Sequence, residues 1–166
     1  SKMQLEYAFD CVFGTRFLDS VLIEESEYFR MAADNVEYNL FNTHATAVRT
    51  NSGATNVKVR SKIGAVTVNN IGTTFHSPAL RHVTLPDTIY HIGVGSFRGC
   101  KKLKNVEGAK KLKYIGVDAF RNCVSLEVFE FPDTLLHIDD EAFRGCTSLK
   151  ELHIPESVVQ IGVDAF

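Results

Sequence analysis

The second half of the chain repeats itself every 23 residues, and this period constrains the fold more than any other feature. Leucine opens each repeat and phenylalanine follows 17 positions later, without any insertion between Leu80 and Phe166. The repeats begin at Leu80, Leu103, Leu126 and Leu149. A fixed period of this length indicates a solenoid, in which each repeat forms one turn and stacked turns bury a common core.

The pattern inside each repeat predicts what one turn contains. Apolar residues stand at the first, fourth and sixth positions, such as Leu126, Phe129 and Phe131, and the spacing of the last two predicts a β-strand with one face inward. A small residue followed by Phe, as in Ala142-Phe143, predicts one short helical turn. That turn is predicted to end where glycine or asparagine tolerates a left-handed backbone. These positions are Gly99, Asn122 and Gly145.

Residues 126–148, LEVFEFPDTLLHIDDEAFRGCTS, closely resemble the motif of the BspA-like (Treponema pallidum type) leucine-rich repeat, L-x-x-L-x-L-P-x-x-L-x-x-I-G-x-x-A-F-x-x-C-x-x. The match covers residues 80–166 and departs locally at Gly108-Ala109, where the motif has Leu-Pro, and at Asp139, where it has Gly. The resemblance implies a leucine-rich-repeat solenoid of parallel strands and a binding role. It also implies a location at the cell surface or outside the cell.

The chain before this region is predicted to form a small α+β N-terminal module or cap over residues 1–56. Residues 3–23 are rich in β-branched and aromatic residues and predict two short strands. Residues 24–41 have helical periodicity. Residues 42–56 collect Asn, Thr, Ser and Gly, which predicts a loop.

The leucine-rich-repeat domain is predicted over residues 57–166, with a degenerate first turn at 57–79. In that turn Ile71 and Phe75 echo Ile92 and Phe97. An atypical first turn is expected at the end of a solenoid, where the core would otherwise meet water. At the other end Phe166 stands without a polar cap, so we expect further repeats there or an end-to-end contact with another molecule.

Composition excludes several classes of function. The formal net charge is -2, so no general attraction to nucleic acid or to anionic membranes is expected. No apolar run approaches the ~20 residues of a transmembrane helix, and no signal peptide is visible. Six lysines between Lys101 and Lys113 form the only basic cluster, but few aromatic residues stand among them for stacking on bases. A solvated surface is the preferred interpretation, with acidic glycans as the alternative.

Cysteine and histidine also fall in columns. Cys100, Cys123 and Cys146 share one position of the repeat and are predicted to be buried free thiols, with a disulfide as the alternative. Equally spaced thiols do not converge on a metal ion. His91 and His137 stand two turns apart, ~10 Å, which is too far to hold one zinc ion.

No nucleophile with a neighbouring base, no carboxylate pair and no phosphate-binding loop is recognisable, so we predict a non-enzymatic protein without a cofactor. The alternative is an enzyme whose chemistry lies in residues 1–56, where Cys11 with His44 is a conceivable thiol pair.

The arginine column is predicted to be structural. Arg121 and Arg144 each follow an acid by three residues, Asp118 and Glu141, on the same side of the turn. Arg98 lacks this local partner, because Gly95 stands at that position, although an acid on the next turn could reach it. Charge balance is preferred over anion binding, which stays the alternative.

The outward face of the strands is the predicted binding surface, because its polar, mixed charges favour protein recognition over an apolar pocket. The candidate residues are Arg81, His82, Thr84, Lys104, Asn105, Glu107, Glu127, Val128, Glu130, Lys150, Glu151 and His153. The leading hypothesis is a module that binds a protein, from a host or an extracellular matrix. The alternative is a structural segment that spaces or displays the N-terminal module or assembles end to end.

Overall fold

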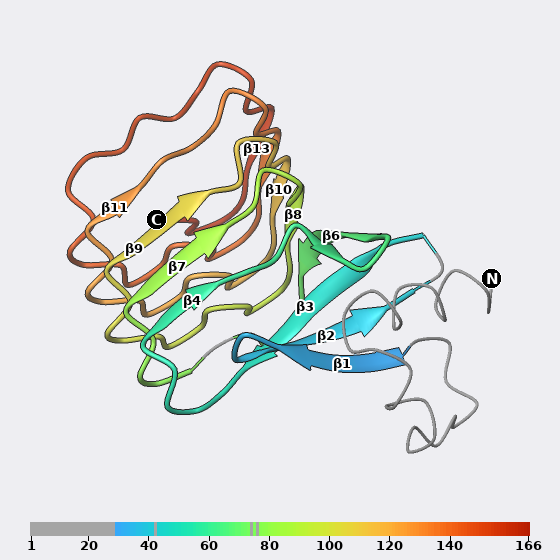
Figure 1. Cartoon of the computed structure of the whole chain (residues 1–166). Helices are drawn as coiled ribbons and strands as arrows, with labels where there is room; N and C mark the ends of the chain where they lie inside the picture. Colours follow the sequence, from blue (N-terminus) through green and yellow to red (C-terminus); the bar gives the residue numbers. More distant parts are fainter. Residues whose placement is uncertain (1–28, 42, 74, 76) are drawn as a thin grey trace, which may run out of the picture.

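The computed structural model describes residues 29–41, 43–73, 75 and 77–166, which form a solenoid of parallel strands with about five turns (Figure 1). Each complete turn contributes to two sheets, which we call the front sheet and the rear sheet. The strands predicted over residues 3–23 lie outside the described residues.

The front sheet has four parallel strands. Their spatial order is β11 (Val128–Phe129), β9 (Asn105–Gly108), β7 (His82–Leu85) and β4 (Asn56–Lys58). The rear sheet begins with an antiparallel part and continues as parallel strands. Its order is β1 (Phe29–Ala33), β2 (Val36–Leu40), β3 (Ala45–Thr50), β6 (Val66–Ile71), β8 (His91–Ile92), β10 (Tyr114–Ile115), β12 (His137–Ile138) and β13 (Gln160–Ile161), with β5 (Lys62–Ile63) paired to β6.

The strand register reproduces the period of the sequence. Ile92 lies beside Ile115, which lies beside Ile138, so equivalent residues of successive repeats are neighbours in the rear sheet. The front sheet has the same register, with Val106 between Val83 and Phe129. Because the register equals the repeat length, every core position meets its own counterpart on the next turn.

The phenylalanine column runs through the core. The rings of Phe97, Phe120 and Phe143 are fully buried and stacked, with centroids 5.0 Å apart in both pairs. Phe75 meets Phe97 edge to face at 5.4 Å, and Ile71 pairs with Ile92, so both residues pack against their counterparts in the following turn. Aromatic pairs at this spacing add to the free energy gained from apolar burial.

The predicted short helical turn is wrong, since no helix occurs in the described residues. Gly95 and Gly99 both have positive φ, 60° and 72°, so the chain changes direction twice within five residues. The amide groups of Phe97 and Gly99 then donate to Ala119 and Arg121 on the next turn, at 2.8 Å each, and not along a helix. The left-handed backbone predicted for Gly99, Asn122 and Gly145 is confirmed.

The helix predicted over residues 24–41 is also wrong where the structure describes it, and the described residues of the predicted α+β module form strands without a helix. Residues 29–40 form the β1–β2 hairpin, which turns at Asp34-Asn35 with φ of 52° and 67°. Two left-handed central residues are typical of a tight hairpin turn. The side chains of Val36, Tyr38 and Leu40 are buried with strand periodicity, a pattern that the helical interpretation overlooked.

The loop predicted over residues 42–56 contains a strand, β3. Ala45 and Ala47 are completely buried on its inner side, while Arg49 is exposed. Their small side chains and the surrounding Thr and Asn residues gave no strand signal. The strand forms because β2 pairs with it on one side and β6 on the other.

The rear sheet crosses the predicted domain boundary at residue 56, through the parallel pairing of β3 with β6. The hydroxyl of Tyr38 also accepts a hydrogen bond from the amide of Arg60 at 3.1 Å. The boundary itself stays a prediction.

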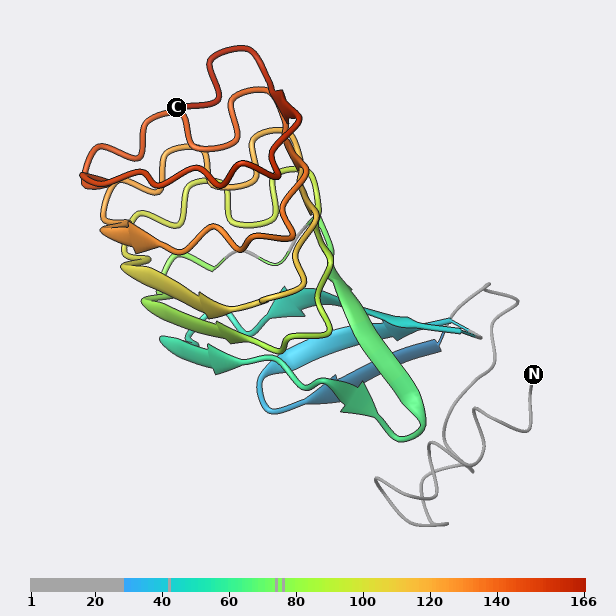
Figure 2. The same ribbon diagram turned by 90° about the horizontal axis from the view of Figure 1, so that it is seen from above.

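Figure 2 shows β1, β2 and β3 extending to one side of the stacked turns. Within the described ranges, no helix has the length and hydrophobicity needed to cross a membrane.

Candidate functional site

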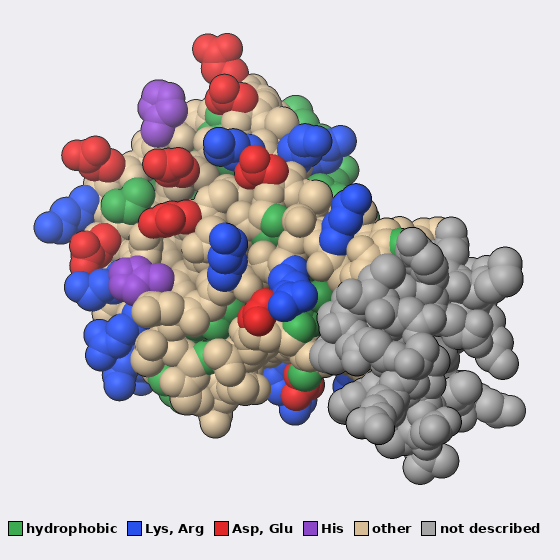
Figure 3. Space-filling model, viewed as in Figure 1, with side chains coloured by type: hydrophobic (Ala, Val, Ile, Leu, Met, Phe, Trp, Pro, Cys, Tyr) green, Lys and Arg blue, Asp and Glu red, His purple; other side chains and the backbone are tan. Residues whose placement is uncertain are grey.

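The outward side of the front sheet carries the predicted binding residues of three turns. His82 and Thr84 on β7 and Glu107 on β9 are exposed, because inward and outward side chains alternate along each strand. Arg81, Lys104, Glu127 and Glu130 flank the strands and are exposed as well. Figure 3 shows acidic and basic side chains interspersed on the visible face, with apolar side chains in small separate areas.

Several of these side chains contact one another across the turns. His82 Nδ1 is hydrogen-bonded to Asn105 Oδ1, and the amide nitrogen of Asn105 donates to Glu107 at 2.7 Å. The ammonium of Lys104 lies 3.5 Å from a carboxylate oxygen of Glu127 on the next turn. These contacts hold the polar face in a defined arrangement over β7, β9 and β11.

The fifth turn differs from the sequence prediction. Lys150, Glu151 and His153 are exposed, but no strand forms in this segment. Leu152 stands where the repeat predicts a core residue, yet 45% of its surface is exposed. A pocket of about 860 Å³ separates this segment from β11.

Sequence reasoning missed a basic pocket of about 720 Å³ beside β4. Lys58, Arg60 and Lys62 line it together with Thr84, and Arg60 is held by Asp34 of the hairpin at 2.5 Å. The alternation of basic residues at positions 58, 60 and 62 was the available signal, and the short connection between β4 and β5 keeps these residues beside one pocket. This signal was not recognised because the first turn departs from the 23-residue pattern.

The arginine column forms a ladder of ion pairs, as predicted. Its members, in spatial order, are Arg98, Asp118, Arg121, Glu141, Arg144 and Asp164. Arg121 lies 3.2 Å from Asp118 on its own turn and 2.7 Å from Glu141 on the next. Arg98 is reached by Asp118 of the following turn at 3.1 Å. Since each arginine has an acidic partner, charge balance accounts for the column.

The three cysteines of the column are buried free thiols, as predicted. The thiols of Cys123 and Cys146 donate to the carbonyl oxygens of Phe97 and Phe120 on the preceding turn, at 3.1 Å each. Burial raises the pKa of Cys100 and Cys146 to about 11 and raises that of Cys123 further. A thiol with so high a pKa is a poor nucleophile at neutral pH, so the column supports packing.

The rear sheet carries an aromatic column that includes His91 and His137, the two histidines at the same position of the repeat. Tyr114 lies between His91 and His137, stacked on His137 with centroids 5.1 Å apart and edge to face with His91. The two imidazoles are therefore kept apart by a ring. In the part of the chain that the structure describes, no group of three or more His, Cys, Asp or Glu side chains lies close enough to hold a metal ion.

Two parallel sheets joined turn by turn, with a stacked Leu, Ile, Phe and Cys core, define a leucine-rich-repeat solenoid. Residues 70–166 match six copies of the BspA type leucine rich repeat region. The chain belongs to this family of repeat proteins. Members of the family are often surface-associated, and leucine-rich-repeat proteins typically serve as protein-interaction scaffolds without enzymatic activity.

Solved structures with the same fold include a leucine-rich-repeat protein of T. pallidum, with 31% identity and a TM-score of 0.76 over 82% of this chain. Another is a leucine-rich-repeat protein of Bacteroides ovatus, with 28% identity and a TM-score of 0.74 over 83% of this chain. A leucine-rich cell surface protein of Faecalibacterium prausnitzii has 21% identity and a TM-score of 0.51 over 86% of this chain, and shares the fold.

The chain spans 66%, 38% and 53% of the length of these three structures. No curated protein sequence matches it.

Proposed function

We propose that this protein is a non-enzymatic recognition module, located at the cell surface or secreted, that binds a protein through the outward side of its front sheet. One observation carries the proposal. The outward side chains of three successive turns form a mainly polar surface that also exposes Val128 on β11, and it is ordered by the contacts from His82 to Glu107 and from Lys104 to Glu127. Preordered side chains lose little entropy on binding, which favours affinity.

The charge of this surface changes along the solenoid. Lys58, Arg60 and Arg81 make the first two turns basic. Glu107, Glu127, Glu130 and Glu151 make the later turns mainly acidic, against Lys104 and Lys150. A partner with the opposite polarity would be oriented by this pattern, since complementary charges set the binding orientation and raise association rates. Host proteins and extracellular matrix proteins are the proposed partners.

Capture of surface and matrix proteins from cell extracts tests the proposal. The immobilised protein is compared with a triple variant, Glu107→Ala, Glu130→Ala and His153→Ala. A matched triple variant, Lys111→Ala, Asp133→Ala and Glu156→Ala, removes three exposed charges outside the front sheet. We expect a captured protein to be lost with the first variant and kept with the second, while all three proteins unfold at the same temperature. Equal capture by all three would reject the front sheet as the binding surface.

End-to-end assembly is the second candidate function. Val159, Ile161 and Val163 of the last turn are exposed by 72%, 51% and 72%, and exposed apolar surface of this kind promotes association. Sedimentation velocity at increasing protein concentration distinguishes the candidates. Association that is lost in an Ile161→Lys, Val163→Lys variant would support assembly, and a single monomeric species at all concentrations would reject it.

A further inference from the structure

The front sheet ends at β11 with an open edge. In the turns before it, the amide of Lys104 donates to the carbonyl of Arg81, and the amide of Glu127 donates to that of Lys104. The corresponding bond from Lys150 to Glu127 is absent among the described residues. If the 23-residue register continued, Glu151 would lie beside Val128, but no strand forms there. The backbone of β11 is therefore available for pairing on one side.

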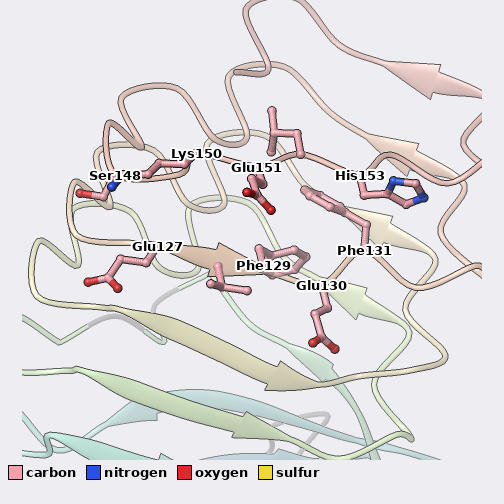
Figure 4. Close-up of a pocket in the computed structure, with 10 residues that line it drawn as sticks. Glu127, Phe129, Glu130, Phe131, Ser148, Lys150, Glu151 and His153 are labelled. Carbon is pink, nitrogen blue, oxygen red and sulfur yellow. The ribbon is translucent and has the colours of Figure 1, made fainter.

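A groove occupies the place of the missing strand pair. It has a volume of about 860 Å³ and is lined by residues 127–131 of the fourth turn and by Ser148 and residues 150–153 of the fifth. Figure 4 shows the side chains of Glu151 and Phe131 in the space between the two segments, with Lys150 and His153 on either side of Glu151 (Figure 4). Open strand edges beside a side-chain groove are the usual sites at which an extended peptide adds a strand.

The groove combines apolar and acidic surface. Phe129 and the half-buried Phe131 face the core side, with Leu152 opposite and 45% exposed. Glu130 and Glu151 make no ion pair within the described residues, whereas Glu127 is held by Lys104. With Glu127 balanced by Lys104, the carboxylates of Glu130 and Glu151 against the ammonium of Lys150 leave the groove with a negative charge at neutral pH.

We propose that this groove binds an extended polypeptide segment, which pairs with β11 as an additional strand and carries alternating apolar and basic side chains. Alternate side chains of a strand point to opposite faces. The inward ones would pack on Phe129, Phe131 and Leu152, and the outward ones would lie near Glu130 and Glu151. Opposite charges on neighbouring strands stabilise their pairing. The proposal deepens the proposed function, since it rests on recognition by the front sheet and specifies the partner segment.

Three labelled ten-residue peptides test the proposal by fluorescence anisotropy with the whole chain. The first alternates valine and lysine, the second alternates valine and glutamate, and the third repeats the first with N-methyl groups on all backbone amides, which removes the N–H donors of both strand edges. We expect the valine–lysine peptide to bind at least about tenfold more tightly than either of the others, because one lacks the charge match and the other lacks strand hydrogen bonds. Equal binding by the first and second peptides, or by the first and third, would overturn the proposal.

Two charge-reversal variants locate the site. Glu151→Lys changes the groove, whereas Glu156→Lys makes the same change at an exposed glutamate outside the front sheet. We expect only Glu151→Lys to weaken the binding of the valine–lysine peptide severalfold. Equal weakening by both would show attraction by the overall charge of the protein and would overturn the groove as the site.

The fifth turn is itself the competing occupant of the β11 edge. A Val128→Cys, Glu151→Cys variant tests this, because the two residues would face each other only if the segment closed on β11. We expect no disulfide between them under mild oxidation, and peptide mapping by mass spectrometry identifies any that forms. A disulfide that forms rapidly in the free protein would overturn the proposal. If none of the peptides binds, while the Glu107→Ala, Glu130→Ala, His153→Ala variant still loses the captured protein, the groove is rejected and the proposed function stands.

Discussion

Gly108 is the residue at which the repeat departs most from its own pattern, and the backbone explains the departure. Its φ is 90°, and a Cβ atom there would lie 1.9 Å from the carbonyl oxygen of Leu85 on the preceding turn. The next residue, Ala109, has a φ of 51° and donates its amide to the same carbonyl. Leu-Pro could not take this conformation, because proline has no amide hydrogen and fixes φ near −65°.

We therefore expect Gly108→Ala to lower the free energy of unfolding by more than about 2 kcal/mol, through left-handed strain and the contact with Leu85. Gly99→Ala is the matched control. Its φ is 72°, but nothing lies within 4 Å of the new Cβ, so strain alone should cost about 1 kcal/mol. Urea unfolding monitored by circular dichroism measures both. Equal losses would show that the carbonyl of Leu85 moves aside without cost.

His91 gives stability a dependence on pH. Burial lowers the pKa of its imidazole below the ordinary value of 6.5, and the carboxylate of Asp139 opposes this shift only in part. As the pH falls below 6.5, the unfolded chain binds a proton at His91 before the folded chain does. Protonation then favours the unfolded state, so this residue's contribution reduces stability as the pH falls from 6.5 to the lowered pKa of the folded state.

A His91→Gln variant should show a smaller loss of stability between about pH 7 and pH 5 than the parent protein. His82→Gln, at an exposed histidine of the front sheet, serves as the control. Thermal unfolding temperatures at four pH values are sufficient for the comparison. Parallel pH profiles for the parent and for His91→Gln would contradict the role given to His91.

At the scale of elements, the period predicted more than the local patterns did. The register of the parallel strands followed directly from the 23-residue repeat, and so did the stacked Phe and Cys columns. The prediction of a short helical turn was wrong because a second left-handed position in each repeat was not recognised. Asp118, Glu141 and Asp164 occupy it with φ of 58°, 54° and 52°, although acidic residues give little signal for such a backbone.

The N-terminal hairpin and the groove could not be predicted for a different reason. The apolar residues of this segment fit one face of a helix: Phe29, Ala32, Ala33, Val36 and Leu40. Only the pairing of β2 with β3 shows that the segment forms strands. The groove depends on a strand that fails to form although its residues follow the repeat. Most of the predicted front-sheet residues nonetheless lie on one face, because strand alternation is local.

The acidic residues with a left-handed backbone, Asp118, Glu141 and Asp164, are also the acidic members of the ion-pair ladder. Arg121 is the centre of this ladder and contacts Asp118 and Glu141, whereas Arg98 contacts only Asp118. Arg121→Gln should lower the free energy of unfolding by about 1 kcal/mol, since it leaves two half-buried carboxylates without this cation. Arg98→Gln, whose side chain is 56% exposed, should cost less than about 0.5 kcal/mol.

Salt distinguishes this explanation from a loss of packing. The difference between Arg121→Gln and the parent should shrink in about 1 M sodium chloride, because the Debye length there is only ~3 Å. Urea unfolding at low and high salt provides the measurement. A difference that is independent of salt would mean that the aliphatic part of Arg121 contributes through packing alone.

At the scale of the whole molecule, each turn depends mainly on its neighbours. Phe120 contacts Phe97 and Phe143 at 5.0 Å and Phe129 at 5.1 Å, all within its own or adjacent turns. In a solenoid, stability is close to a sum of the intrinsic terms of single turns and the interfaces between neighbours. Damage to one turn should therefore weaken the adjacent turns and leave distant ones intact.

Phe120→Leu tests this expectation, because it removes part of the ~3–5 kcal/mol that a buried phenylalanine contributes relative to alanine. Hydrogen exchange followed by mass spectrometry should show faster exchange in β8, β10 and β12 and little change in β1 and β2. Tyr38→Phe is the complementary variant, since it removes the acceptor of the Arg60 amide at the junction of hairpin and solenoid. It should affect β1, β2 and β3 first. Uniform loss of protection in both variants would mean that the continuous rear sheet makes hairpin and solenoid one cooperative unit.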